Sequence, residues 1–202
     1  MVKYFLSAAV LTATLSSAAY AAPVPVFSDS FNYGPDLALN AQDSLFAGKW
    51  VTTDGTVDYL SPPPAQFSEL CRSTAGCVDL DGSTGDAGVF STVQSFAAGW
   101  YTLAIELFGN GRGAAADDVT ITLGSWTTTL ANILSGADAS KSFVFHTDGG
   151  VLSFANSGGD NQGAVLSSVS LAAVPVPAAG LMLMAGLAGL GVLRRRKTTL
   201  AV

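Results

Sequence analysis

The sequence predicts an all-β protein, a jelly-roll β-sandwich placed between an N-terminal signal peptide and one C-terminal transmembrane helix. Two observations predict this organisation. The middle of the chain contains short runs in which apolar and polar residues alternate, and glycine-rich turns separate these runs. The two ends are apolar and carry basic residues, whereas all the acidic residues lie in the middle. We therefore divide the chain into residues 1–21, 22–173 and 174–202.

Residues 1–21 have the three parts of a Sec signal peptide. A lysine lies near the start, an apolar stretch follows, and small residues end in Ala19-Tyr20-Ala21. This ending is an A-x-A cleavage site, so we expect signal peptidase to cut between Ala21 and Ala22 after passage through the Sec translocon. The apolar stretch is too short and too rich in Ser and Thr to be a permanent membrane anchor.

Residues 22–173 are expected to form the sandwich as one domain. Runs with a period of two residues predict half-buried strands with one face inward. Turn pairs such as Asp54-Gly55 and Asp148-Gly149 separate them. Short helices are expected within Leu37–Phe46 and Ala131–Ala137. The alternating runs are centred on Val57-Tyr59, Val78-Leu80, Leu103-Ile105-Leu107, Val119-Ile121-Leu123, Phe143-Phe145, Leu152-Phe154 and Val169-Leu171.

Cys71 and Cys77 are the only cysteines of the chain. In a protein that leaves the cytoplasm, two such cysteines favour a disulfide, here one that closes a short loop. A zinc site would need more ligands than two thiols and the single histidine, His146. A redox pair would normally have the tighter Cys-x-x-Cys spacing.

Three carboxylates, Asp79, Asp81 and Asp86, lie close together in the sequence beside glycines. Two interpretations stay open for them. Asp81-Gly82 is a common turn pair, which favours a plain turn. The same carboxylates are also the oxygen ligands that calcium takes in an extracellular medium. We expect no other cofactor.

Candidate ligand-binding and catalytic residues are few. Trp126 lies among small polar residues and is the best candidate for an exposed ligand-binding ring, whereas Trp100 begins an apolar strand and is expected in the core. His146 shares a strand face with Val144, so we expect it to face solvent. The sequence contains no nucleophile elbow, zinc-protease motif or phosphate-binding loop. These observations favour a protein without catalytic activity, ahead of a carbohydrate-binding module and of a glycan-acting hydrolase.

The C-terminal segment, residues 174–202, predicts a membrane anchor. Pro175 and Pro177 end any preceding strand. Sixteen uncharged residues, 178–193, follow and would form a helix about 24 Å long, which spans a bilayer with local thinning. A basic cluster then stops transfer and stays on the cytoplasmic side, namely Arg194, Arg195, Arg196 and Lys197.

This segment resembles the VPLPA-type CTERM sorting signal, a variant of the PEP-CTERM signal of Gram-negative bacteria. The resemblance is carried by the proline motif, the short Gly- and Leu-rich span and the terminal Arg cluster. It implies that an exosortase-type membrane protease cuts near Pro177 and Ala178. The body would then pass from a transient inner-membrane anchor to the cell surface or extracellular matrix. The motif consists of Val174, Pro175, Val176, Pro177 and Ala178, with Val176 in place of the usual Leu.

The body resembles the choice-of-anchor domains that often precede such signals. The resemblance covers roughly residues 50–173 and implies a galactose-binding-like jelly roll, with an association with exopolysaccharide. Two departures are FSDSFNYG at the start of the domain and Ser167-Ser168 where the family usually has Asp-Asn. The matching segments are WVTTDGTVDYL (50–60), CVDLDG (77–82), GVFSTVQSF (88–96), GWYTLAIELFGN (99–110) and GAVLSSVSL (163–171).

The charge of the body restricts its partners. Residues 22–173 contain four basic and fifteen acidic residues, a net charge of −11, although the whole chain sums to −6. Such a body disfavours nucleic acid and favours neutral glycans or cations. The sequence therefore predicts a non-catalytic, exported surface or extracellular-matrix protein, with a carbohydrate-binding module as the alternative.

Overall fold

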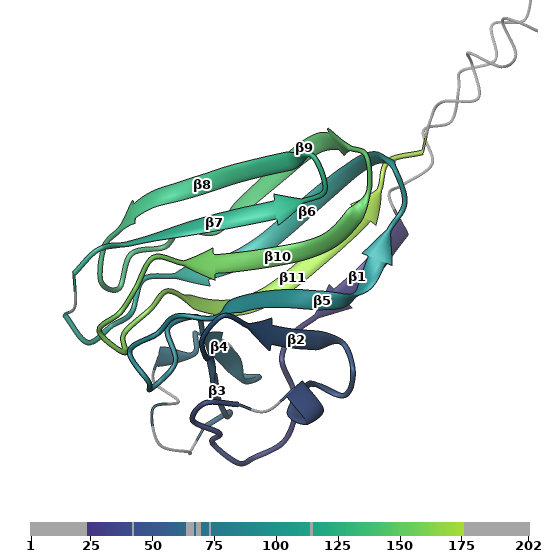
Figure 1. Ribbon diagram of the computed structural model, residues 1–202. Helices are drawn as coiled ribbons and strands as arrows, with labels where there is room; N and C mark the ends of the chain where they lie inside the picture. The colour runs from purple at the N-terminus through teal and green to yellow at the C-terminus, as the bar shows by residue number, and fades with distance from the viewer. Residues whose placement is uncertain are drawn as a thin grey trace, which may run out of the picture. The chain divides into compact units, whose positions relative to one another are not determined.

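The computed structural model describes residues 24–41, 43–63, 67, 70–72, 74–113 and 115–175, and it shows two antiparallel β-sheets packed face to face (Figure 1). The predicted β-sandwich is confirmed. The six-stranded sheet contains β1 (Val24–Asp29), β3 (Asp58–Leu60), β4 (Cys77–Asp79), β6 (Gly99–Phe108), β9 (Lys141–Thr147) and β11 (Val165–Ala173). The five-stranded sheet contains β2 (Trp50–Thr53), β5 (Val89–Phe96), β7 (Asp117–Leu123), β8 (Trp126–Ile133) and β10 (Gly150–Asn156).

The strand order is that of a jelly roll. In one sheet the order is β4-β11-β6-β9, and in the other it is β5-β10-β7-β8, so the chain passes repeatedly between the two layers. β3 and β2 each extend one edge of this arrangement. β4 pairs with the start of β11, and β1 pairs with the later part of the same edge of β11.

The alternating runs form strands because each places its apolar residues on the inner face. In β6, Tyr101, Leu103, Ile105 and Leu107 are buried, whereas the residues between them are exposed or half-buried. β7, in the other sheet, shows the same alternation, and so does the middle of β11, the strand that pairs with β6. Burial of these two inner faces against each other is the main source of stability in such a fold.

Aromatic rings fill one end of the core around Trp50 on β2. The Trp50 ring is fully buried and stacks on Phe90, with 4.4 Å between the ring centroids. Phe27 and Phe31, from the N-terminal strand and the loop after it, pack against other sides of the same indole. The N-terminal strand is therefore tied into the core through its rings as well as through its backbone.

One of the two predicted helices is wrong. Within Leu37–Phe46 the chain does form a short 3₁₀ helix, η1 (Asp43–Phe46). Residues 131–137, in contrast, complete β8 and then turn. The β-branched run before them pairs with β7 and continues this pairing to Ile133, across an irregularity where Asn132 has a φ of +57°.

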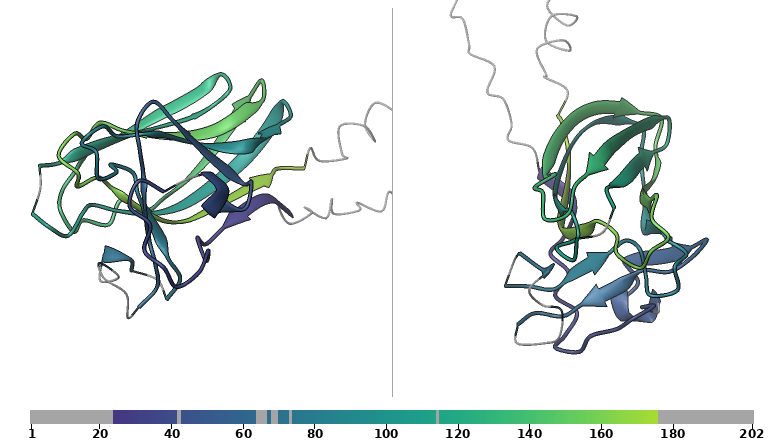
Figure 2. Two further views of the ribbon diagram at one scale, coloured as in Figure 1. Left: turned by 60° about the horizontal axis from the view of Figure 1, so that its bottom comes forward. Right: turned by 90° about the vertical axis from the view of Figure 1, so that its left-hand side faces the viewer.

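The first and last strands of the sandwich are neighbours. β1 pairs with β11 in antiparallel register, and Figure 2 shows the purple and yellow-green strands side by side. Val24 lies opposite Ala173. Beyond β11, the Val174 amide donates to the Trp100 carbonyl at 2.8 Å. The chain therefore enters and leaves the sandwich at the same end, which is the end of the β5–β6 hairpin.

Candidate functional site

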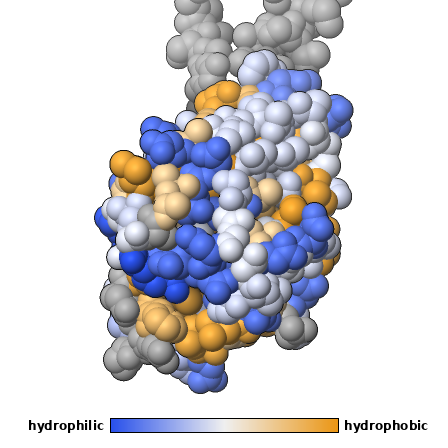
Figure 3. All heavy atoms as spheres, turned by 60° about the vertical axis from the view of Figure 1, so that its left-hand side comes forward, coloured by the Kyte–Doolittle hydropathy of each residue, from blue (hydrophilic) through white to orange (hydrophobic). Residues whose placement is uncertain are grey.

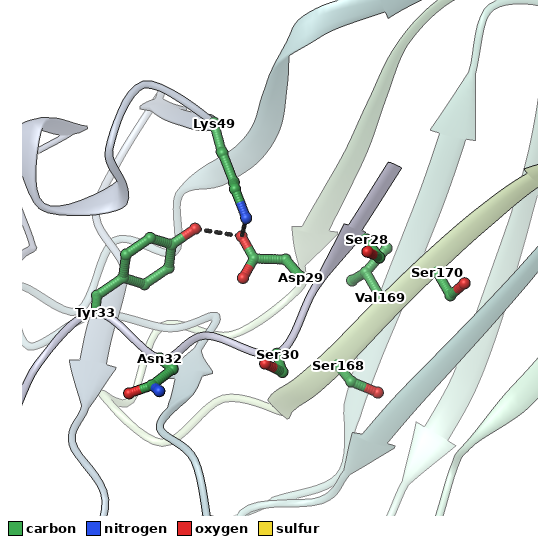
Figure 4. Close-up of a pocket in the computed structure, with 9 residues that line it drawn as sticks. All are labelled: Ser28, Asp29, Ser30, Asn32, Tyr33, Lys49, Ser168, Val169 and Ser170. Carbon is green, nitrogen blue, oxygen red and sulfur yellow. Dashed lines mark hydrogen bonds and ion pairs between the residues drawn. The ribbon is translucent and has the colours of Figure 1, made fainter. Parts of the chain in front are cut away.

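A cleft opens at the edge of the six-stranded sheet, where β1 and β4 fail to meet. β11 pairs with β4 only through Val165 and Leu166, and with β1 only from Val169 onward. The gap between the two edge strands leaves a cavity of about 510 Å³ (Figure 4). Its lining is mostly hydroxyl, amide and charged side chains, from Ser28, Asp29, Ser30, Asn32, Tyr33, Lys49, Ser168, Val169 and Ser170.

Asp29 is the centre of the inner wall, and its side chain is 5% exposed. Its Oδ1 accepts the Phe31 amide at 2.9 Å, and its Oδ2 accepts the Trp50 indole N–H at 2.8 Å. The Tyr33 hydroxyl also donates to Oδ2, and the Lys49 ammonium lies 3.6 Å from the same oxygen. Figure 4 shows both side chains reaching toward this carboxylate. Asp29 therefore has donors on both oxygens and serves to join β1 to the core.

The tyrosines beside the cleft are held as neutral hydroxyls. Burial raises the pKa of Tyr33 well above its usual range, and the hydrogen bond to the Asp29 carboxylate raises it further. Burial likewise raises the pKa of Tyr59, whose hydroxyl donates to the Gly34 carbonyl at 3.0 Å. Both groups are donors to fixed partners. The cleft thus presents hydroxyl, amide and ammonium groups suited to hydrogen bonding.

Trp100 stands exposed on the outer face of the same sheet, and the expectation that it lies in the core is wrong. Its side chain is 51% exposed and contacts the His146 ring at 5.5 Å between centroids. Side chains alternate between the two faces of a strand, and Tyr101 and Leu103 of β6 point inward, so Trp100 points outward. The same parity places His146 on the outer face of β9, as predicted.

Trp126, the ligand-binding residue predicted from sequence, packs against the core instead of standing free. It is half-buried and stacks on Phe145, with 3.9 Å between the ring centroids, and it also contacts Phe143. One face of its ring is therefore covered by protein. Of the three tryptophans, Trp100 has the most open ring.

The predicted disulfide between Cys71 and Cys77 is confirmed. The two residues are buried in a small cluster with Leu60 and Val165, separate from the main core. The bond holds the loop before β4 against the outer side of that strand. It therefore fixes the edge of the sheet on the side of the cleft opposite β1.

The three carboxylates of the sequence-predicted calcium site do not form one group. Asp79 and Asp81 are buried, whereas Asp86 is exposed. Asp79 forms an ion pair with Arg112 at 2.8 Å and accepts a hydrogen bond from the side-chain amide of Asn110. Within the described ranges, no three His, Cys, Asp or Glu side chains gather in a way that could hold a metal ion.

The processing sites predicted at the two ends fall almost entirely outside the described residues. Val174 and Pro175 are the last described residues, and the other sorting-signal positions, 176–178 and 194–197, lie beyond them. The signal-cleavage residues Ala19, Ala21 and Ala22 precede the first described residue. In the part of the chain that is described, no helix is long and apolar enough to cross a membrane.

No protein-family model matches this sequence, and no curated protein matches it significantly. Solved structures share its fold. The K3 cleaved adhesin domain of Lys-gingipain from Porphyromonas gingivalis is 16% identical with a TM-score of 0.50, over 74% of this chain and 100% of that one. At this identity the likeness concerns the fold alone.

Two further structures are less similar. TmCBM61, solved in complex with β-1,4-galactotriose, is 12% identical with a TM-score of 0.42, over 66% of this chain and 97% of that one. An exo-β-1,3-galactanase from Phanerochaete chrysosporium is 19% identical with a TM-score of 0.37, over 59% of this chain. This chain spans only 27% of that enzyme's length. TM-scores below 0.5 carry no argument about function.

Proposed function

We propose that this chain is an exported, non-catalytic surface protein whose sandwich binds neutral carbohydrate. Export rests on the signal peptide at residues 1–21, and retention on the apolar segment and basic tail of residues 174–202. Signal peptidase and an exosortase-type protease would be the processing partners. The mature body would be released at the surface of a Gram-negative bacterium or into its extracellular matrix.

The arrangement of the sandwich ends supports this sorting. Val24 and Ala173 are register partners, so the two strands nearest in sequence to the expected processing points lie side by side. Cleavage at both would remove no described strand. The loops at the opposite end and the outer faces of both sheets are built by residues between these two points.

Exposure of Trp100 is the observation that carries carbohydrate binding. An indole that is 51% exposed on the outer face of a sheet offers an apolar face for a sugar ring together with a polar N–H at its edge. Its other neighbours on the outer face are small, apart from His146 and the exposed Val144 on β9. They include Thr102 and Ala104 on β6 and Ala172 and Ser170 on β11.

The face between Trp100 and the cleft suits an extended, neutral ligand. Ala104 lies four residues along β6 from Trp100, about 14 Å at the usual strand rise, and pairs with Ser170, which pairs with Ser28 at the cleft. Most side chains along this path are uncharged, small or hydroxylated. An oligosaccharide could therefore stack on Trp100 and place its hydroxyls in the cleft.

The state of the reactive groups supports a binding role over hydrolysis. Glycoside hydrolysis needs two carboxyl groups free to exchange protons or attack on either side of one bond. Asp29, the carboxylate of the cleft, accepts hydrogen bonds on both oxygens, and Tyr33 is held protonated. Asp29 and Tyr33 are held by hydrogen bonds to fixed partners, and such bonds keep the wall of a binding cleft rigid.

Binding is tested with the full chain purified in detergent, titrated against a panel of neutral and acidic polysaccharides. We expect saturable binding to a neutral glycan, weakened about tenfold or more by Trp100→Ala, in line with loss of a central aromatic contact. Val93→Ala is the control, since Val93 is 55% exposed on β5 of the other sheet. Absence of binding to every glycan, or full binding by Trp100→Ala, would overturn the carbohydrate proposal.

Sorting is tested separately in cells. Deleting residues 174–202 should release the protein from the membrane fraction and from the surface, whereas deleting only 198–202 removes nothing from the motif, helix or basic cluster. N-terminal sequencing of the mature protein should begin at Ala22. Unchanged surface association after the larger deletion would contradict the sorting proposal, whatever the glycan titration gives.

A further inference from the structure

The strand order of the described residues leaves both sheets with open sides. The five-stranded sheet ends at β2 and at β8, and the six-stranded sheet ends at β9 on one side and at β3 and β1 on the other. An edge strand presents backbone N–H and C=O groups that no neighbouring strand takes, so another strand can add there. Proteins limit such pairing with edge strands that are short, charged, irregular or interrupted by proline.

Four of these edges carry such protections. β2 and β3 are four and three residues long. β1 contains Pro25, and its pairing with β11 shifts register between Pro25 and Phe27. β9 begins with the exposed Lys141 and also carries the exposed His146. Each of these strands is therefore a poor template for a further strand.

β8 lacks these protections over most of its length. It is eight residues long, reads WTTTLANI, and contains neither a charge nor a proline. The nearest charged residues along the chain are Asp118 before it and Asp138 after it. Its pairing with β7 is regular from Trp126 to Leu130, and no described strand pairs with its other side. β8 is therefore the edge of this sandwich that is best suited to accept a strand.

The outer face beside this edge is uncharged as well. Thr120 and Thr122 of β7 lie opposite Thr129 and Thr127 of β8, with their hydroxyl oxygens 3.1 and 3.3 Å apart. Figure 3 shows pale atoms of intermediate hydropathy over the upper part of the molecule, where β7 and β8 lie in Figure 1. A body with an excess of acidic residues repels its own copy. The uncharged hairpin is a place where two copies can meet without opposing carboxylates.

The sequence of β8 suits antiparallel pairing with a copy of itself. Pairing about a two-fold axis at Thr129 places Thr127 of one copy opposite Ala131 of the other, and both side chains are exposed. It also places Thr128 opposite Leu130, and both are half-buried. These pairs join β-branched, small and aliphatic side chains, which antiparallel strands accept opposite each other. The edge is therefore self-complementary, as a two-fold interface requires.

An exposed apolar residue lies where the second copy would cover it. Leu134 directly follows β8 and is 58% exposed. It lines a cavity of about 320 Å³ together with residues from the end of β8 and the start of β9. In the pairing about Thr129, the turn at Gly124 and Ser125 of the second copy lies beside this position. The pairing thus removes from water an apolar side chain that the single chain exposes.

We propose that two copies of this chain form a two-fold dimer through β8. The two β8 edges pair antiparallel about Thr129, and the two five-stranded sheets join into one continuous sheet. A second copy fits this edge better than a charged strand of another protein, because the strand offers no charge to pair with and each of its residues meets one of similar kind.

The dimer is expected to be weak. One pair of eight-residue edges buries less surface than a standard stable interface, which takes about 1,600 Å² in total. A dimer also carries two Trp100 faces, and a long polysaccharide that reaches both would bind with avidity. This last consequence rests on the proposed carbohydrate binding, whereas the pairing of β8 does not.

The test is sedimentation analysis of the full chain in neutral detergent. The parent should show a monomer–dimer equilibrium with a Kd of about 10⁻⁶ to 10⁻⁴ M. Thr129→Lys should weaken the dimer at least about tenfold, because two like charges would meet at the axis. Ser142→Lys is the matched control, since it adds the same charge at an exposed position of the edge strand β9. Association through the apolar segment 178–193 would not respond to Thr129→Lys.

Cross-linking reads the contact directly. Thr129→Cys should be joined to its copy by a short thiol-reactive cross-linker, whereas Ser142→Cys should not. The two native cysteines are paired with each other, so they do not compete for the reagent. Thr129 is exposed, and circular dichroism checks that its variants fold.

A parent chain that stays monomeric up to about 1 mM overturns the proposal. So does a dimer that Thr129→Lys leaves intact or that Ser142→Lys dissociates, because either result places the interface elsewhere. If Thr129→Lys does not fold, absence of cross-linking by Thr129→Cys overturns it. None of these measurements involves a glycan, so their failure and the failure of the carbohydrate proposal are independent results.

Discussion

The indole N–H of Trp50 donates to Asp29 Oδ2 at 2.8 Å, and this contact joins the N-terminal strand to the five-stranded sheet. Asp29 belongs to β1 of one sheet and Trp50 to β2 of the other. The hydrogen bond therefore crosses between the layers. Phe31, which lies between them in sequence, has a φ of +52°. Its backbone N–H donates a hydrogen bond to the same carboxylate.

Removing this carboxylate should destabilise the sandwich strongly. Asp29→Ala leaves the Trp50 N–H, the Phe31 amide and the Lys49 ammonium without their acceptor, and we expect a loss of about 3–5 kcal/mol in the free energy of unfolding. Asp29→Asn keeps one acceptor oxygen and should cost about half as much. Urea denaturation measures both, with the exposed Asp36→Ala as control. Equal stability of Asp29→Ala and the parent would contradict this role.

Tyr33 should make the fold sensitive to alkali. Its pKa is raised in the folded state by burial and by Asp29, so the folded protein keeps a proton that the unfolded chain releases near pH 10. The corresponding stability is complete below about pH 10 and declines as the pH rises further. In Tyr33→Phe the free energy of unfolding should fall less steeply with pH, by the slope that the release of one proton contributes. Urea midpoints between about pH 8 and 11 test it, and parallel curves for the two proteins would refute it.

Strand positions could be predicted because a half-buried strand places apolar residues at every second position. Leu103, Ile105 and Leu107 predict both the strand and its inner face, and the structure confirms them. The exposure of Trp100 follows from the same parity. Our expectation failed there because it gave more weight to the apolar neighbours of Trp100 than to its position in the alternation.

Neither the cleft nor the buried group of Asp81, Asn156 and Asp117 could be predicted. Asp29 and Lys49 meet because β1 adds to the edge of β11, a pairing between the two ends of the domain. Asp81 follows β4, Asp117 begins β7 and Asn156 ends β10, and the order of those strands in the sheets brings them together. Sequence spacing instead grouped Asp81 with its neighbour Asp86, which faces solvent.

The ion pair between Arg112 and Asp79 should contribute more to the stability of the fold at high pH than at low pH. Burial raises the pKa of Asp79 to about 8, whereas Arg112 opposes the shift. A raised carboxyl pKa means that its ionisation costs stability as the pH rises from about 4 to 8. Arg112→Leu removes the cation that opposes this shift, so its cost should be smaller at about pH 5 than at about pH 9, where it should reach about 2–3 kcal/mol.

Urea denaturation of Arg112→Leu at these two pH values, in EGTA, checks this expectation. Lys141→Met serves as the control, because it removes an exposed positive charge from β9. A cost for Arg112→Leu that is equal at both pH values, or larger at the lower one, would show that the carboxylate is ionised throughout. The EGTA keeps any bound cation from contributing to the comparison.

The two adjacent glycines Gly158 and Gly159 should respond differently to replacement by alanine. Gly158→Ala places a Cβ against Asp81 Oδ2 and Asn156 Nδ2, so it must push the β10–β11 loop away from the buried carboxylates, at a cost of about 1–3 kcal/mol. Gly159→Ala meets nothing closer than the Gly85 carbonyl at 3.7 Å, and its backbone needs no glycine, so we expect almost no change. Thermal unfolding of both variants measures the difference. Equal midpoints would mean that the loop does not close on Asp81 as described, because a rigid contact there cannot admit a methyl group without displacement.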